Sequence, residues 1–253
     1  MAMNRREMQR LAQRQDAAQM RIAASAAARY RGILRADYKQ MADAVRQGGK
    51  ANRLSSDIGK ALELNWQSAA RSGGTATALY LGQRKKSMGC EIHTKAGLFT
   101  DAIRAGAAEY GRRWLARKIT QINTTTANQV RDIVQRYDGE SITDIADRID
   151  ALGAAFSAVR AQVIARTETH AAANFASEAV AVATGDPLKK QWVATSDDRT
   201  RSDHLDIDGQ TVGINEQFDV GGELLDYPGD PSGSAENVIN CRCQAVYIDP
   251  EYR

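Results

Sequence analysis

The distribution of proline constrains the fold of this chain more than any other feature. All four prolines of the 253-residue sequence lie at or after Pro187, so the long stretch before it contains none. Proline breaks the interior of a helix, and apolar residues recur in this stretch at three- and four-residue spacing, as from Met8 to Val45. We therefore expect a mostly α protein, with long helices in residues 1–185 and a small α+β module of short strands and turns in 187–253.

Glycine pairs and short polar segments divide the chain into three predicted regions. The first helix should end at Gly48-Gly49, and the last helical segment should end just before Pro187. The regions are a basic helical arm (1–53), a helical region (54–122) and a C-terminal domain (123–253) made of helices in 126–184 and an acidic α+β module in 187–250.

Further glycines and capping residues predict breaks inside these helical regions, and apolar runs after them predict strands. The predicted breaks lie at Ser72-Gly73-Gly74, at a loop or short hairpin in 75–97, at helix N-caps in Thr124-Thr125-Thr126 and Ser141, and at Gly139 and Gly153. The predicted strands are residues 191–195 and 245–248.

Charge is distributed unevenly along the chain. Residues 1–53 contain 12 Lys+Arg against 4 Asp+Glu, whereas residues 186–253 contain 6 against 14. A basic amphipathic arm suits a polyanion or an acidic protein surface, although its narrow apolar stripe fits a bundle helix of the same chain equally well. The arginines that would make such a contact are Arg5, Arg6, Arg10, Arg14, Arg21, Arg29, Arg31 and Arg35.

Targeting signals and disulfides are not expected. The sequence contains no run of about 18 apolar residues that could span a membrane, and its first residues lack the apolar core of a signal peptide. Three cysteines, two of them one residue apart, do not form a disulfide framework. A reducing cytoplasm is therefore the expected place of folding.

Two segments carry chemical information. In the first, Arg166 and Glu168 lie two positions apart in a predicted helix, so they should point to different sides and each meet a group outside that helix. The second is a C-terminal cassette, which runs through Asp197-Asp198-Arg199-Thr200-Arg201-Ser202-Asp203-His204, Asp208-Gly209, Pro228-Gly229-Asp230-Pro231 and Asn240-Cys241-Arg242-Cys243.

These motifs, in this order, resemble the minor head (head morphogenesis) proteins of tailed bacteriophages, typified by the F protein of phage Mu. The resemblance covers about residues 120–249. It implies a non-enzymatic structural or assembly protein of the phage head, located in the head interior or portal region of the virion and in the host cytoplasm during assembly. The implied partners are the portal protein, the major capsid protein or scaffold and, non-specifically, packaged DNA, with no membrane.

The cassette itself permits three chemical interpretations. His204, Cys241 and Cys243 are suitable zinc ligands, although a Cys-x-Cys pair is not the usual knuckle and a fourth ligand (Asp203, Asp206, Cys90 or His93) is not evident. A nuclease could use His204 as acid/base and Arg199 with Arg201 as a phosphate clamp, but the acidic surroundings would repel nucleic acid.

The third interpretation is favoured, namely a structural cassette in which the cysteines and His204 are buried and the arginines pair with nearby carboxylates. A disulfide between the two neighbouring cysteines would be strained. The predicted structural residues are Arg166, Glu168, Asp198, Arg199, Arg201, His204, Asp208, Gly209, Pro228, Asn240, Cys241, Arg242 and Cys243.

Overall fold

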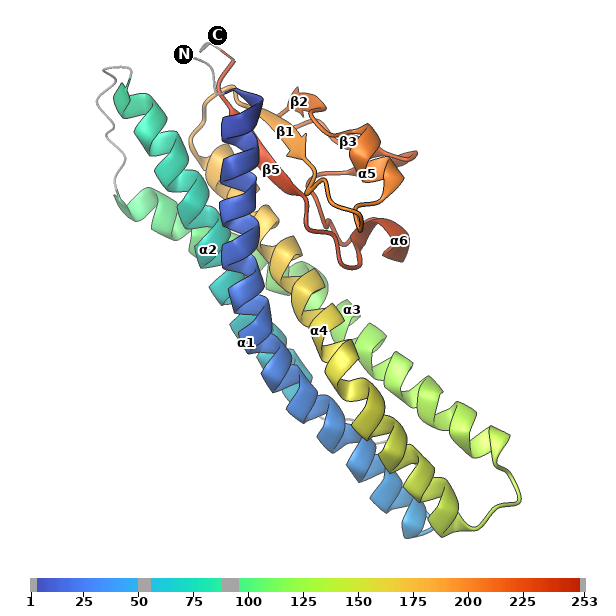
Figure 1. Ribbon diagram of the computed structural model, residues 1–253. Helices are drawn as coiled ribbons and strands as arrows, with labels where there is room; N and C mark the ends of the chain where they lie inside the picture. Colours follow the sequence, from blue (N-terminus) through green and yellow to red (C-terminus); the bar gives the residue numbers. More distant parts are fainter. Residues whose placement is uncertain (1–3, 50–55, 88–95, 251–253) are drawn as a thin grey trace.

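A computed structural model describes residues 4–49, 56–87 and 96–250, and it consists of four long helices followed by a small module (Figure 1). The helices are α1 (Arg5–Arg46), α2 (Asp57–Ser87), α3 (Ala96–Arg136) and α4 (Ile142–Ala183). The module contains β1 (Lys189–Val193), α5 (Ser202–Asp206), β2 (Thr211–Gly213), β3 (Phe218–Val220), β4 (Glu223–Leu225), α6 (Ala235–Val238) and β5 (Gln244–Ile248). The predicted fold class is confirmed. No helix among the described residues combines the length and apolar character needed to cross a membrane.

The first helix packs along the fourth and is part of the bundle. Asn4 caps α1 with a capping box in which its side chain accepts from the Glu7 backbone N–H and the Glu7 side chain accepts from the Asn4 backbone N–H. The 42 residues of α1 and of α4 each correspond to about 63 Å of helix. Of the two interpretations of the basic arm, the bundle helix is therefore the one that the structure adopts.

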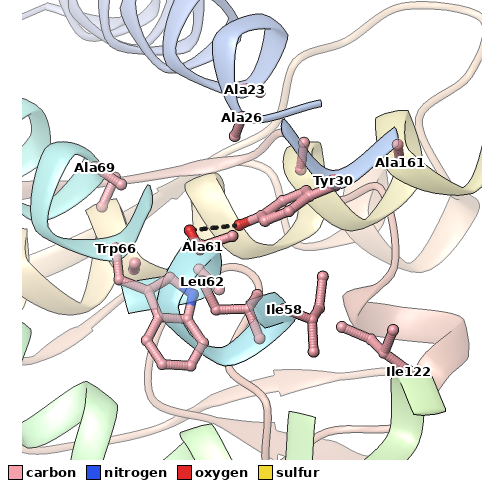
Figure 2. Packing of buried hydrophobic residues seen from close by; sticks show 14 of the residues in the cluster. Ala23, Ala26, Tyr30, Ile58, Ala61, Leu62, Trp66, Ala69, Ile122 and Ala161 are labelled. Carbon is pink, nitrogen blue, oxygen red and sulfur yellow. Dashed lines mark hydrogen bonds between the residues drawn. The ribbon is translucent and has the colours of Figure 1, made fainter. Parts of the chain in front are cut away.

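The bundle core is built from alanines around a few large side chains (Figure 2). Tyr30 of α1 and Trp66 of α2 are almost fully buried, and the Tyr30 hydroxyl donates to the Ala61 carbonyl oxygen over 3.5 Å. Ala161 and Ala165 of α4 are also buried. Because alanine buries little apolar area per residue, this core depends on close helix approach in addition to its few large side chains.

Two of the helix breaks predicted at glycine were wrong. α2 continues through Gly73-Gly74 to Ser87, and α4 continues through Gly153. A Cβ at position 73 would lie 2.3 Å from the carbonyl oxygen of Ala173, and one at position 153 would lie 2.4 Å from Tyr38 Cβ. These glycines therefore serve close contact between helices, at a helix-propensity cost of about 1 kcal/mol each.

The threonine cap was also wrong, because α3 runs unbroken from Ala96 to Arg136. Within it, the Thr126 hydroxyl donates to the Ile122 carbonyl oxygen of the preceding turn. The Ser141 cap is confirmed, since its hydroxyl accepts from the Asp144 backbone N–H at the start of α4. Of the predicted loop, 75–87 is helical and 88–95 lies outside the described residues.

The module packs on one end of the bundle through a three-stranded antiparallel sheet in the order β2-β1-β5, with β3 and β4 forming a separate hairpin. Val193 of β1 and Val246 of β5 pack on Ala12 of α1. Trp192 points to the other side, into the interior of the module. On the α4 side, the buried Lys190 Nζ lies 2.6 Å from Glu178 Oε1.

Candidate functional site: the cassette between the bundle and the module

The cassette brings one histidine and two cysteines together in the interior of the module. His204 lies on the short helix α5, whereas Cys241 and Cys243 lie in the turn that leads into β5. His204 Nδ1 is 3.7 Å from Cys241 Sγ and 3.5 Å from Cys243 Sγ, and all three residues are at most 3% exposed. Both cysteines are free thiols. The ring of Trp192 packs edge-on to the imidazole, with centroids 5.3 Å apart.

The two thiols differ in their ionisation. The hydrogen bond with Cys243 lowers the pKa of Cys241, whereas the same contact, together with burial, raises the pKa of Cys243. The two thiols therefore titrate in two steps, with Cys241 losing its proton before Cys243.

A left-handed backbone conformation at Asn240 sets the turn that carries the cysteines. Its φ is 60°, in the region that asparagine tolerates better than most residues. The Asn240 N–H donates to Thr167 Oγ1 over 3.0 Å, and its side-chain oxygen accepts from Arg166 Nη1 over 3.1 Å. Helix α4 therefore holds this turn through residues Arg166 and Thr167.

Glu168 points in the opposite direction, into the bundle. Its side chain is almost fully buried, with Lys118 Nζ 2.9 Å from Oε1 and Trp66 Nε1 donating to Oε2 over 3.2 Å. The two-residue spacing thus has the predicted consequence, because Arg166 contacts the module while Glu168 pairs with α3 and α2.

A second network surrounds Arg242, which lies between the two cysteines. Arg242 Nη2 is 2.6 and 2.7 Å from the two carboxylate oxygens of Asp197. Asp197 also accepts from the backbone N–H of Arg199 and from the Thr200 hydroxyl, as in an Asx turn. The hydrogen bond from Arg242 is the main reason that the pKa of Asp197 lies well below its usual range.

The neighbouring residues of the cassette lie at the edge of the Asp197–Arg242 network or outside it. Asp198 is exposed, and its neighbour Asp197 is the carboxylate that pairs with Arg242. Arg199 is exposed and reaches Asp197 only at 3.4 Å, whereas Arg201 Nη2 donates to the Ile239 carbonyl oxygen over 2.5 Å. The Asp-x-x-Thr spacing of the Asx turn is the signal that could have indicated Asp197.

The remaining cassette positions connect the module to its surroundings through hydrogen bonds. Asp208 accepts from the Ala194 backbone N–H over 3.0 Å and forms an ion pair with Arg5 of α1. Gly209 has a φ of 90° and donates its N–H to the Trp192 carbonyl oxygen. The Pro228 carbonyl oxygen accepts from Asn174 Nδ2 of α4 over 2.9 Å.

Sequence reasoning missed a buried polar junction where α1, α4 and β5 meet. Gln19 and Gln244 exchange two hydrogen bonds of 3.1 and 2.9 Å between their side-chain amides. His170 Nε2 lies 3.3 Å from Asp16 Oδ1, but the two atoms are not aligned for a hydrogen bond. Burial lowers the pKa of His170 to about 3 and raises that of Asp16. His170 is therefore a buried packing residue that is neutral at physiological pH.

This junction borders a small cavity of about 240 Å³. Its walls include Asp16, Arg242, Gln244 and Ser196, whose φ of 56° is rare for a residue other than glycine. The cavity lies between the N-terminal part of α1 and the turn that follows β1.

The arginines of α1 lie mainly on the face that points away from α4. Arg6, Arg10, Arg14 and Arg21 follow one another at spacings of four, four and seven residues, which place them on one side of a helix. All four are exposed, as are Arg5, Arg29 and Arg31. Among the described residues, no ion pair involves Arg6, Arg10, Arg14, Arg21, Arg29 or Arg31, whereas Arg5 pairs with Asp208 and Arg35 with Asp150.

The geometry does not form the phosphate-cleaving arrangement that was considered as an alternative. His204 is buried against the thiols, while Arg199 is exposed and paired to Asp197. In the part of the chain that the structure describes, no hydrogen bond joins His204 to Arg199 or Arg201.

A helical bundle that holds a compact, arginine- and cysteine-containing module at one end is the class of structure seen here, and comparison with known proteins identifies the family. The family model described as "Phage Mu protein F like protein" matches residues 116–246. The chain belongs to this family of phage proteins, and the predicted resemblance is confirmed.

One of three individual relatives is named as a phage head protein. The chain is 31% identical to the minor head protein GP7 of Bacillus phage SPP1 over 113 residues, which are 44% of this chain and 36% of that protein. It is 32% identical over 152 residues to a protein of Enterococcus faecalis named NAD(+)--arginine ADP-ribosyltransferase EFV, covering 56% of this chain and 31% of that protein. The YqbB protein of Bacillus subtilis is 29% identical over 135 residues, covering 51% and 44%.

The matched segments span less than half the length of each of these relatives. No solved structure matches the chain.

Proposed function

We propose that this protein is a structural component of phage head assembly that associates with the portal and the interior of the capsid, and that the basic face of α1 contacts packaged DNA without sequence preference. Membership of the family, and the similarity to a minor head protein, support the first part. The second part rests on one observation, the row of exposed arginines on α1 that make no ion pair within the described residues.

Electrostatics supports DNA as the partner of this face. Of the four acidic residues in α1, Asp37 is buried and Asp16 lines the cavity beside the module. Glu7 is exposed and caps the start of the helix, and Asp43 pairs with Lys39 and Arg46, so few carboxylates face the row of arginines. Arginines held on a rigid helix can each replace a counterion on the phosphate backbone. The acidic module packs on the opposite side of the first turns of α1, at Ala12, which lies two positions from both Arg10 and Arg14. The helix therefore separates the acidic module from the row of arginines.

An enzymatic role is not proposed. The activity in the name of the Enterococcus protein belongs to a chain of which this one matches 31%. His170 and His204 are both about 1% exposed, so neither imidazole can exchange protons with a bound substrate without rearrangement.

The association with the portal is tested by co-expression with the portal protein of the same phage, followed by affinity purification and by analysis of purified heads. We expect a complex that survives purification and a fixed number of copies per head. Heads that contain the portal but none of this protein would contradict the assembly role.

The contact with DNA is tested by charge reversal rather than by truncation, because removing α1 would also remove part of the bundle core. The variant carries Arg6→Glu, Arg10→Glu, Arg14→Glu and Arg21→Glu. The matched control reverses four exposed arginines of α3: Arg113, Arg117, Arg131 and Arg136.

Binding to duplex DNA is measured at several salt concentrations. Each phosphate contact contributes about −0.9 to the slope of log K against log salt, so the α1 variant should lose roughly 3–4 from the slope's magnitude. The control variant should retain most of the slope. An equal loss in both variants would show that binding follows net charge and not the face of α1.

A further inference from the structure

The His204, Cys241 and Cys243 cluster has a geometry that its role in packing does not explain. Its three donor atoms lie within 4.8 Å of one another, and all three residues are buried. We infer that this cluster is a zinc site in which His204 Nδ1 and the two Sγ atoms bind one Zn²⁺ ion.

The distances between the donor atoms match those of tetrahedral zinc. Zinc lies about 2.3 Å from a thiolate sulfur and about 2.0–2.1 Å from an imidazole nitrogen, so tetrahedral angles place a sulfur and a nitrogen about 3.5–3.6 Å apart. The observed Nδ1 to Sγ distances are 3.5 Å for Cys243 and 3.7 Å for Cys241. Both nitrogen–sulfur distances therefore already correspond to those around one zinc ion.

The chemistry of the surroundings favours a cation here. The walls of the cluster are apolar, with Trp192 and Phe218 among the buried residues of the same core. Among the residues that the structure describes, no hydrogen bond joins the two thiols or the imidazole to a side chain outside the group, whereas a zinc ion would use all three donors at once. Edge-on packing of Trp192 holds the imidazole ring in place while Nδ1 faces the sulfurs.

Three of the four tetrahedral corners are thereby assigned. Among the described residues, no fourth histidine, cysteine, aspartate or glutamate joins the group. The fourth corner is left to a water molecule, as in zinc sites with three protein ligands. Asp203 and Asp206, considered as ligands from the sequence, are not members of the cluster, and Cys90 and His93 lie outside the described residues.

Such an ion would connect two parts of the module that are far apart in the sequence. His204 belongs to α5, and the cysteines precede β5, 37 and 39 positions later. The short strands of the module, three to five residues each, provide few backbone hydrogen bonds of their own. A metal link between α5 and the turn before β5 would therefore stabilise the module as a unit.

The test uses the full chain without a polyhistidine tag, purified in the absence of chelators. Elemental analysis should find one zinc per chain in the wild type and in the Cys90→Ser control. It should find none in His204→Ala or in the Cys241→Ser/Cys243→Ser double variant. Cobalt substitution should give the thiolate charge-transfer band and the d–d absorption of a tetrahedral site, and the double variant should lose both.

A second measurement keeps the inference testable if the variants do not fold. X-ray absorption at the zinc edge of the wild type should show two sulfur and two nitrogen or oxygen scatterers. Removal of the metal by a chelator should lower the Tm, and Zn²⁺ but not Mg²⁺ should restore it. A folded wild type that takes up neither zinc nor cobalt, metal retained by the double variant, metal lost from Cys90→Ser, or a different number of sulfur scatterers would each overturn the inference.

Discussion

The contact between α2 and α4 at Gly73 leads to a quantitative prediction about Gly73→Ala. The added methyl group would lie 2.3 Å from the Ala173 carbonyl oxygen and 2.8 Å from its carbonyl carbon. Both atoms belong to the backbone of α4, so a side-chain rotation cannot relieve the clash. Overpacking costs up to about 3 kcal/mol, whereas alanine favours the helix over glycine by about 1 kcal/mol. We expect a net loss of about 2 kcal/mol in the free energy of unfolding.

Urea denaturation followed by circular dichroism measures this difference, provided that the m-value is unchanged. The control is Gly111→Ala in α3, where an added Cβ would meet no atom within 4 Å. That variant should gain up to about 1 kcal/mol, because only helix propensity changes. A Gly73→Ala protein as stable as the wild type, or a Gly111→Ala protein destabilised to the same extent, would refute the reasoning about close helix packing.

Three further predictions concern polar groups of the bundle and the module. Because the pKa of His170 is about 3 in the folded protein and near 6.5 when unfolded, the unfolded state binds more protons between these values. The unfolding free energy should therefore fall by up to about 1.4 kcal/mol per unit as pH decreases through this window, and His170→Gln should flatten that slope in urea titrations. Lys118→Met should cost about 3–5 kcal/mol in the same assay, since it leaves the buried Glu168 carboxylate without its cationic partner; a loss below 1 kcal/mol would contradict the pairing. A double-mutant cycle of Asp197→Ala and Arg242→Ala should give a coupling energy of about 1–3 kcal/mol. A coupling near zero would show that this ion pair does not stabilise the module.

The division into long helices and a small C-terminal module with short strands could be predicted because it depends on local signals. Proline is confined to the last part of the chain, and the apolar spacing before Pro187 fits only helices. The breaks at Gly73 and Gly153 could not be judged in the same way. A glycine that ends a helix and one that lets two helices touch look alike in sequence, and only the distant partners, Ala173 and Tyr38, distinguish them.

The site shows the same division between local and distant information. The motif predicted that His204, Cys241 and Cys243 belong to one cassette, and the structure brings their donor atoms together. The junction of Gln19, His170 and Gln244 comes from three remote segments, and its members are common polar residues with no characteristic spacing. The choice between Asp197 and Asp198 depended on one turn, whose side-chain hydrogen bonds sequence alone does not display.

The antiparallel bundle with its module at one end also gives the molecule two distinguishable poles. α1 begins and β5 ends at the same pole, where Val246 packs on Ala12, whereas the turn between α3 and α4 marks the other (Figure 1). α4 connects these poles over about 60 Å. A label near the start of α1 and a second label in the 137–140 turn would therefore mark the two poles of the molecule. Their separate positions in images of the head would report the orientation of the protein relative to the portal axis.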